Sequence, residues 1–217
     1  MIQTKTLLLV LIAAAALGAG VWLGEAFFAR TETQPAVEIA GIYLPDSKPI
    51  ENFTLTHQSG RPFTREDLKG RWTFLYFGYT YCPDVCPMTL LELNKLANQL
   101  VAQGVDRDTA FMLISVDPER DTPARLGEYT AHFNPKFTGA TGAPEELAKL
   151  TEQLGVAYFV PDHEPGENYT VDHSSTVVLM NPDGRLQAVF TPPHQPDVMA
   201  ADFVKIRDRY RNARPGG

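Results

Sequence analysis

The pattern of hydrophobic positions divides the chain into an apolar start, a polar stretch and a region of alternating short apolar runs. The first apolar run covers residues 7–24 without a charged residue, with Lys5 before it and Glu25 after it. This run is just long enough for a transmembrane helix, and Trp22 near its end suits an interfacial anchor. Its small residues also fit a cleaved signal peptide, so both interpretations stay open.

These features predict four segments. We expect a cytoplasmic stub and membrane anchor over residues 1–29, then a tether over residues 30–48, where Thr, Glu, Gln and Pro show little periodicity. A folded domain follows over residues 49–212, and residues 213–217 form a short tail. Lys5 on the short side of the apolar run favours a cytoplasmic amino terminus, which places the folded domain outside the inner membrane, in the periplasm or an equivalent oxidising compartment.

Within the folded region, short apolar runs predict strands, and apolar residues at helical spacing predict helices. Near-continuous apolar runs, typical of buried strands, cover residues 72–77 and 110–116. A strand at residues 176–180 is followed by the turn sequence Asn-Pro-Asp-Gly, after which residues 186–190 return antiparallel. The remaining pattern predicts a hairpin over residues 53–63, and helices at residues 64–67, 87–103, 126–133, 144–154 and 199–210.

The order of these elements predicts the fold class. Alternating strands and helices followed by an antiparallel pair indicate an α/β fold, with a mixed sheet flanked by helices. Functional groups on such a sheet collect at the strand ends. The 217 residues are 44% hydrophobic, which is enough for one core, and the net charge of -7 argues against nucleic-acid binding.

The two cysteines of the chain, Cys82 and Cys86, lie between a predicted buried strand and a predicted helix. At the helix start, unpaired N–H groups and the helix dipole are expected to stabilise a thiolate on Cys86. One helical turn between the thiols lets both face one point. Three interpretations stay open: a structural disulfide, a redox pair one residue longer than Cys-x-x-Cys, and a metal site.

A metal site needs at least one further ligand, and the five histidines are the candidates. His173 immediately precedes a buried strand, where a loop can deliver it to the end of the sheet, so its context makes it the preferred ligand. Spacing alone does not bring it to the cysteines. For the other four histidines, the sequence context favours ordinary structural or surface roles. They lie, in order, in a hairpin turn, near a helix end, in a solvated polar segment and in an exposed Pro-rich loop: His57, His132, His163 and His194.

Three motifs point to a known family. They are Tyr-Cys-Pro-Asp-Val-Cys-Pro at residues 81–87, Asp-Pro-Glu-Arg-Asp-Thr-Pro at residues 117–123, and Val-Asp-His at residues 171–173, followed by Asn-Pro-Asp-Gly at residues 181–184. In order and spacing they resemble the Sco (SenC/PrrC) family, membrane-anchored copper proteins associated with cytochrome c oxidase assembly. The resemblance covers roughly residues 50–210, and it implies a thioredoxin-like fold.

The resemblance also implies a ligand set. Cys82 and Cys86 correspond to the two thiolate ligands and His173 to the imidazole ligand of one copper ion. The chemistry fits, because thiolates select Cu(I) and imidazole also tolerates Cu(II). Zinc is the main rival metal, since two cysteines and a histidine with an open position suit it as well. The family match favours copper.

Four acidic residues lie near the expected site: Asp84, Asp117, Asp121 and Asp172. Asp84 is expected to cap the helix, and a structural role in pinning a loop through backbone N–H groups is favoured for Asp117 and Asp121. The alternative is to orient the histidine or to present charge to a partner. For Asp172 neither role is preferred.

The family role is a metallochaperone that delivers copper to the binuclear copper centre of cytochrome c oxidase subunit II, with other copper chaperones or thiol reductants as further partners. This role needs no bond-making chemistry on a substrate. The alternative is a thiol-disulfide oxidoreductase that reduces the ligand cysteines of the oxidase subunit. It requires Cys82 and Cys86 as a redox-active disulfide, but not His173. A peroxidase, suggested by the peroxiredoxin-like Val-Cys-Pro at residues 85–87, leaves Cys82 and His173 unexplained.

Overall fold

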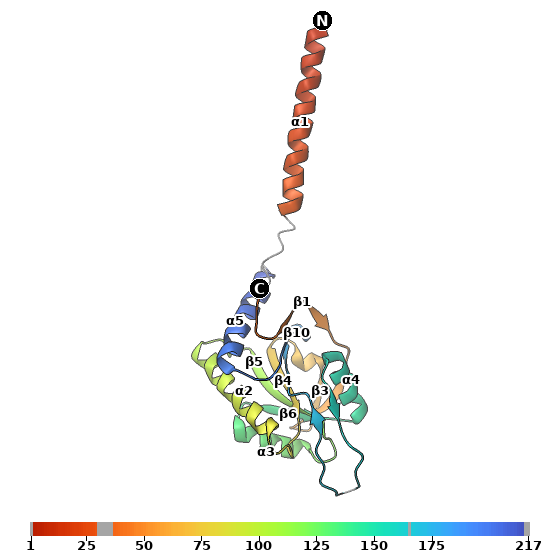
Figure 1. Cartoon of the computed structure of the whole chain (residues 1–217), viewed down its shortest axis with the longest axis vertical. Helices are drawn as coiled ribbons and strands as arrows, with labels where there is room; N and C mark the ends of the chain where they lie inside the picture. The colour runs from red at the N-terminus through yellow and green to blue at the C-terminus, as the bar shows by residue number, and fades with distance from the viewer. Residues whose placement is uncertain (1, 30–36, 165, 215–217) are drawn as a thin grey trace. The chain divides into compact units, whose positions relative to one another are not determined.

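The computed structural model describes residues 2–29, 37–164 and 166–214 (Figure 1). The chain divides into two compact units, Met1–Ala36 and Val37–Gly217. The first unit contains helix α1 (Ile2–Ala29). Within the described residues, no helix is both long and apolar enough to cross a membrane.

The second unit is built from strands and helices in mixed order. Its strands, within the described residues, are β1 (Ile42–Pro49), β2 (Thr54–His57), β3 (Pro62–Thr64), β4 (Trp72–Gly78), β5 (Thr109–Ser115), β6 (Thr138–Thr141), β7 (Tyr158–Phe159), β8 (Asp172–His173), β9 (Val177–Met180) and β10 (Arg185–Phe190). Its helices are the short 3₁₀ helix η1 (Arg65–Leu68), α2 (Val85–Ala102), α3 (Pro123–Phe133), α4 (Pro144–Leu154) and α5 (Pro196–Asn212).

Eight of these strands form one mixed sheet in the order β1-β10-β9-β4-β5-β6-β2-β3, and β7 pairs separately with β8. Strands β4, β5 and β6 are parallel neighbours, whereas β9 runs antiparallel to β4 and to β10. Helix α2 packs against α5, and Figure 1 shows both on the same side of this unit, with α4 on the other. The predicted α/β fold with a mixed sheet and flanking helices is confirmed.

Strand β4 lies at the centre of the core, where all seven of its residues are buried. A central strand covered on both faces has no side that meets water, which explains its continuous apolar sequence. Phe74 of β4 stacks on Phe111 of β5 at 4.9 Å between ring centres, and Trp72 meets Phe203 of α5 edge-on at 5.6 Å. This strand ends just before the segment that carries Cys82 and Cys86.

The end of the predicted tether is a strand. Residues Ile42–Pro49 form β1, which pairs antiparallel with β10 at the edge of the sheet. The pairing shifts register between Tyr43 and Lys48, around Pro45 and Asp46. Pro45 and Asp46 interrupt the alternation of polar and apolar residues that would predict a strand, so the sequence pattern does not predict β1. The structure accepts the proline because β1 is an edge strand. Residues 30–36 of the tether lie outside the described residues.

Helix ends agree well with the pattern, whereas α2, α3 and α5 begin two or three residues earlier than predicted. Gly155 follows α4 with a φ of 69°, and Gly104 follows α2 with a φ of 68°, the left-handed conformation that favours glycine. Helix α2 begins at Val85, two residues before the predicted Pro87. Cys86 therefore lies inside the first turn of α2.

Candidate metal site at the end of the central strand

The structure brings Cys82, Cys86 and His173 together. Cys82 lies in the loop after β4, Cys86 in the first turn of α2, and His173 in β8. The two Sγ atoms and an imidazole nitrogen all lie within 4.8 Å of one another, and both cysteines are free thiols. Among the side chains that the structure describes, this is the one group of three or more His, Cys, Asp or Glu residues close enough to share a metal ion.

The two thiols have different environments. The backbone N–H of Cys86 donates to Cys82 Sγ at 3.4 Å, so one of the free N–H groups of the helix start binds the sulfur of Cys82. Cys86 has no exposed surface, whereas Cys82 is half-buried. Burial raises the pKa of the Cys86 thiol to about 12. The expectation that the helix start stabilises a thiolate on Cys86 is therefore wrong, because desolvation dominates there.

His173 presents one specific nitrogen to the thiols. Its Nδ1 lies 3.3 Å from the carbonyl oxygen of Ser174, and a carbonyl only accepts, so Nδ1 carries the proton. The unprotonated Nε2 then faces Cys86 Sγ at 3.3 Å. Burial lowers the pKa of His173, which keeps the ring neutral and able to bind a metal. The rings of Tyr76 and Tyr79 pack edge-on beside it, with centres at 6.2 and 5.9 Å.

Gly78, the last residue of β4, leaves the space that the Cys86 thiol occupies. A Cβ atom on Gly78 would lie 2.7 Å from Cys86 Sγ and 3.2 Å from a ring carbon of Tyr76. The first distance is well inside van der Waals contact. A side chain at this position would therefore displace the buried sulfur.

A two-stranded hairpin outside the main sheet delivers His173. In it, Tyr158 of β7 pairs with His173 of β8, and the N–H of Ser174 donates to the carbonyl of Ala157 at 2.8 Å. The N–H of Val171 donates to the hydroxyl of Tyr79 at 3.2 Å. Because Tyr79 belongs to the loop that leads to Cys82, this bond joins the hairpin to the cysteine loop.

The contacts of Asp121 agree with its structural interpretation, whereas the carboxylate of Asp117 accepts from side chains and from no backbone N–H group. Asp121 is fully buried and accepts hydrogen bonds from the N–H and hydroxyl of Thr80, at 2.8 and 2.5 Å, and from Ser115 Oγ at 2.6 Å. It thus holds the start of the cysteine loop to the end of β5, and burial raises its pKa. Asp117, also buried, accepts from Arg120 Nε at 2.6 Å.

Asp84 and Asp172 make no such contacts. Asp84 occupies the residue before α2, but its side chain makes no capping hydrogen bond, so the expected cap is wrong. Asp172 is exposed on β8 next to His173. Its charge raises the pKa of His173, but this effect is smaller than the lowering by burial.

Two other histidines are more constrained than expected. His163 is not simply solvated, because its ring stacks on Tyr169 at 3.7 Å and its Nε2 lies 2.9 Å from a carboxylate oxygen of Glu119. His194 is half-buried, and its Nε2 donates to the carbonyl of Ser175 at 2.6 Å. Neither belongs to the three-residue site.

Sequence reasoning overlooked Gly78, Tyr79 and Arg120 as parts of this site. A signal existed for Gly78, because a glycine that ends an aromatic strand suggests close approach of another group. Arg120 lies between two acidic residues in a loop expected at the strand ends, but nothing in its spacing shows which distant segments it contacts.

Two free thiols and an imidazole that meet at the end of a buried strand define a site for one soft metal ion on an α/β fold. The family model SCO1/SenC matches residues 44–208. The chain therefore belongs to the SCO1/SenC family.

Individual relatives agree with this assignment. A putative copper-binding protein of Stutzerimonas stutzeri is 39% identical over 170 residues, which are 78% of this chain and 82% of that protein. The crystal structure of Arabidopsis thaliana ScoI with copper bound has a TM-score of 0.68 at 37% identity, over 74% of this chain and 98% of that one.

A third structure, BsSco, has a TM-score of 0.60 at 25% identity, over 76% of this chain and 97% of that one. It is described as a member of the Sco family of cytochrome c oxidase assembly proteins in which a disulfide switch was identified. The mixed sheet with flanking helices in this chain matches the thioredoxin-like fold of these Sco structures.

Proposed function

We propose that the protein is a copper metallochaperone, which binds one copper ion through Cys82 Sγ, Cys86 Sγ and His173 Nε2 and delivers it to the binuclear copper centre of cytochrome c oxidase subunit II. The observation that carries this proposal is the meeting of three donors, from distant parts of the chain, within 4.8 Å. Two thiolates favour Cu(I), and the imidazole extends the set to Cu(II). The copper-bound Arabidopsis ScoI and the Stutzerimonas putative copper-binding protein support copper as the ion.

Delivery by ligand exchange needs an accessible site that the protein does not saturate. Three protein donors leave a coordination position for a ligand from the partner. Cys82 is the more exposed thiol and is the natural point of first contact with that ligand. His173 lies on a hairpin outside the main sheet, so its release does not require a break in the pairing of that sheet.

A metal titration tests the binding step. The reduced protein should bind one equivalent of copper and retain it against competing zinc. Oxidation of the two cysteines to a disulfide should abolish binding, because a disulfide sulfur is a poor donor. Equal copper on reduced and oxidised protein, or displacement of copper by equimolar zinc, would contradict the proposal.

The second candidate function is a thiol-disulfide oxidoreductase that reduces the ligand cysteines of the oxidase subunit. One observation favours it: both thiols are free and lie one helical turn apart, with Cys86 N–H directed at Cys82 Sγ. In that reaction the two thiols give up two electrons and two protons to the disulfide of the partner and become a disulfide themselves. The disulfide switch described for BsSco supports this redox chemistry.

Two substitutions separate the candidates in cells. His173→Ala keeps both thiols, whereas Cys82→Ala removes one. A metallochaperone should lose copper in subunit II with either variant, whereas a reductase should fail only with Cys82→Ala. The measurement is oxidase copper content and activity at matched protein levels, and normal oxidase with His173→Ala would exclude delivery through the three-donor site.

We also propose that residues 1–29 anchor the protein in the inner membrane, with the folded unit in the periplasm. The uncharged run at residues 7–24 supports this proposal. Membrane fractionation with protease digestion from the outer side of the membrane is the test. A mature chain that begins between Ala13 and Ala29 would instead show a cleaved signal peptide.

A further inference from the structure

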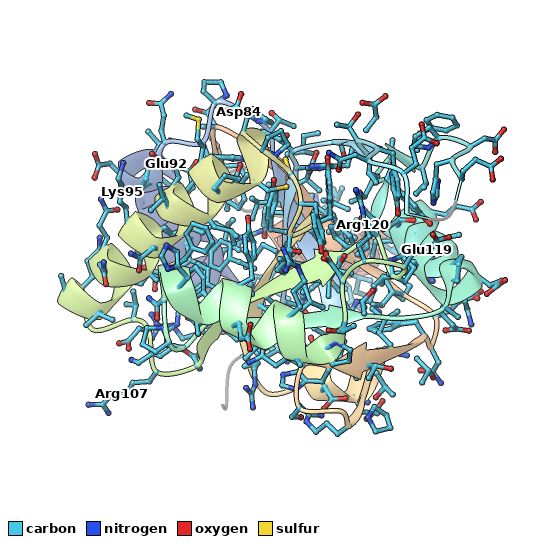
Figure 2. The ribbon with its side chains drawn as sticks, turned by 90° about the horizontal axis from the view of Figure 1, so that it is seen from below. Asp84, Glu92, Lys95, Arg107, Glu119 and Arg120 are labelled. Atoms are coloured by element: carbon cyan, nitrogen blue, oxygen red, sulfur yellow. The ribbon has the colours of Figure 1, made fainter. Side chains whose placement is uncertain are left out.

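Arg120 lies at the centre of an aromatic and charged cluster beside the proposed metal site (Figure 2). Its side chain is 15% exposed, and its Nε donates to the buried carboxylate of Asp117 at 2.6 Å. The guanidinium carbon also lies 5.0 Å from the ring centre of Tyr81 and 5.5 Å from that of Tyr79. Arg120 thus connects its own loop to the two tyrosines of the cysteine loop.

Arg120 also holds a third segment, the one that leads to His173. Its Nη1 donates to the carbonyl of Tyr169 at 2.9 Å, and its guanidinium lies 3.5 Å from the centre of the Tyr169 ring. The hydroxyl of Tyr169 donates to Asp117 at 2.7 Å. The carbonyl, ring and hydroxyl of Tyr169 are therefore all fixed by Asp117 and Arg120.

The position of Tyr169 limits where His173 can go. His173 is four positions after Tyr169, and an extended chain spans at most about 3.6 Å per residue. Between them, Val171 is tied to the hydroxyl of Tyr79. A freed Tyr169 would leave the hairpin held to the cysteine loop mainly by this single hydrogen bond and by the contacts of the imidazole.

We propose that Arg120 is a positioning residue of the metal site: together with Asp117 and Tyr169 it forms a clasp that holds the segment before His173 against the cysteine loop, and so keeps the imidazole beside the two thiols. This inference rests on the proposed copper site. Arginine suits the task because one planar group stacks on Tyr169 while its N–H groups bind a carboxylate and a carbonyl, which the point charge of lysine does not reproduce.

The clasp acts on one of three donors, so its loss should affect the two copper states differently. Cu(I) is held well by two thiolates, whereas Cu(II) requires the nitrogen donor. Arg120→Met should lower the Cu(II) affinity about 10- to 100-fold, the usual effect of losing a residue that orients a ligand. The Cu(I) affinity should stay close to that of the unaltered protein.

The experiment compares Arg120→Met and Arg120→Lys with Arg107→Met in the full chain. Arg107 is an exposed arginine after α2, labelled in Figure 2, whose side chain makes no hydrogen bond or ion pair with the described residues. The readouts are Cu(II) and Cu(I) affinities by competition, the Cu(II)–thiolate absorption band, and amide exchange of residues 171–174 in the metal-free protein. We expect faster exchange and weaker Cu(II) binding for both Arg120 variants, with lysine intermediate, and neither change for Arg107→Met.

Several outcomes would overturn the proposal. A folded Arg120→Met protein with unaltered Cu(II) affinity and unaltered exchange removes the positioning role, and so does an equal loss of Cu(I) and Cu(II) affinity. If Arg120→Met does not fold, Arg120→Lys and Tyr169→Phe carry the test, and unaltered Cu(II) binding in both contradicts the clasp. Absence of copper binding by the unaltered protein would instead contradict the proposed function, while amide exchange of the metal-free chain still reports on the clasp.

Discussion

At the scale of single residues, Gly78 is the position where least change is tolerated near the thiols. Gly78→Ala would place a Cβ atom 2.7 Å from Cys86 Sγ in a part of the core with no free space. We expect a loss of about 1–3 kcal/mol in the free energy of unfolding, typical of overpacking, together with weaker copper binding. Urea unfolding and copper titration of the same preparations measure both effects.

The matched control for this substitution is Gly127→Ala in α3. There the nearest atoms to an added Cβ belong to Gln58 at 3.7 Å, an ordinary contact. An alanine inside a helix should raise the free energy of unfolding by up to about 1 kcal/mol relative to glycine. Equal stability and equal copper binding of Gly78→Ala and the unaltered protein would show that Cys86 does not need the space.

The unequal thiols lead to a second prediction at this scale. In the reduced, metal-free protein an alkylating agent near neutral pH should modify Cys82 roughly tenfold faster than Cys86, or more, because reaction requires an accessible thiolate. Cys86 has no exposed surface and its pKa is raised to about 12. Peptide mass spectrometry over time gives both rates, and similar rates would contradict the burial of Cys86.

At the scale of elements, His163 should make the segment between β7 and β8 contribute more to the folding stability at low pH than at high pH. Its Nδ1 lies 2.8 Å from the carbonyl of Pro161 and its Nε2 2.9 Å from Glu119, so both nitrogens donate only when the ring is protonated. These two partners, in that order, raise the pKa of His163 above 6.5. The stability that His163 adds is thus fully present below the unfolded pKa and is lost as the pH rises through the folded pKa.

The direction in which the stability from His163 changes with pH can be measured with the substitution His163→Gln. The difference in unfolding free energy between the unaltered protein and this variant should be larger at about pH 5.5 than at about pH 8.5. His57, whose pKa is lowered mainly by burial, provides a control that should show the opposite trend. A difference for His163→Gln that grows as the pH rises would contradict the assigned contacts.

Helix α2 carries a second feature that bears on delivery. Among the described residues α2 exposes Val85, Met88 and Leu91 at 38%, 61% and 50%, near Cys82 in the sequence. Asp84 and Glu92, which flank this stretch in the sequence, are labelled in Figure 2. In the proposed delivery, we expect a partner whose ligand reaches Cys82 to contact this neighbouring surface. Met88→Glu should therefore slow copper transfer to the soluble domain of subunit II about tenfold, equivalent to about 1.4 kcal/mol, while copper affinity stays the same.

The control for that prediction lies on the same helix. Val101 is similarly exposed, at 51%, but is thirteen residues further along, which is about 20 Å in a helix. Val101→Glu should leave the transfer rate unchanged. Equal rates for Met88→Glu and Val101→Glu would show that this face of α2 is not used in transfer.

Elements with a strong local pattern were predictable, and those defined by distant contacts were not. Strand β4 is continuous in apolar sequence, and the only two cysteines of the chain follow it within eight residues, so the strand and the cysteine pair were both predictable. Strand β1 was not found, because Pro45 and Asp46 disrupt its alternation and its partner β10 lies far along the chain. Arg120 was overlooked for a similar reason: it bonds to Tyr169, 49 positions away, and no local pattern reports such a contact.

At the scale of the whole molecule, the core and the proposed copper site both belong to the unit Val37–Gly217. Within the described residues the buried hydrophobic side chains run from Ile50 to Ile206, and all three donors lie between these limits. A chain that begins at Val37 therefore contains the whole of the described core and all three donors. The fragment should fold alone and bind one copper ion with the affinity of the full chain.

This prediction is tested by comparing the fragment with the full chain in the same detergent buffer. Because no described side chain of α1 belongs to the core or to the three-donor group, the two proteins should unfold at temperatures within about 4 °C of each other, the shift that about 1 kcal/mol produces in a domain of this size. Their Cu(I) and Cu(II) affinities should agree as well. A fragment that folds but binds Cu(II) more weakly would show that residues 1–36 reach the copper site. A fragment that fails to fold would show that they stabilise the folded unit.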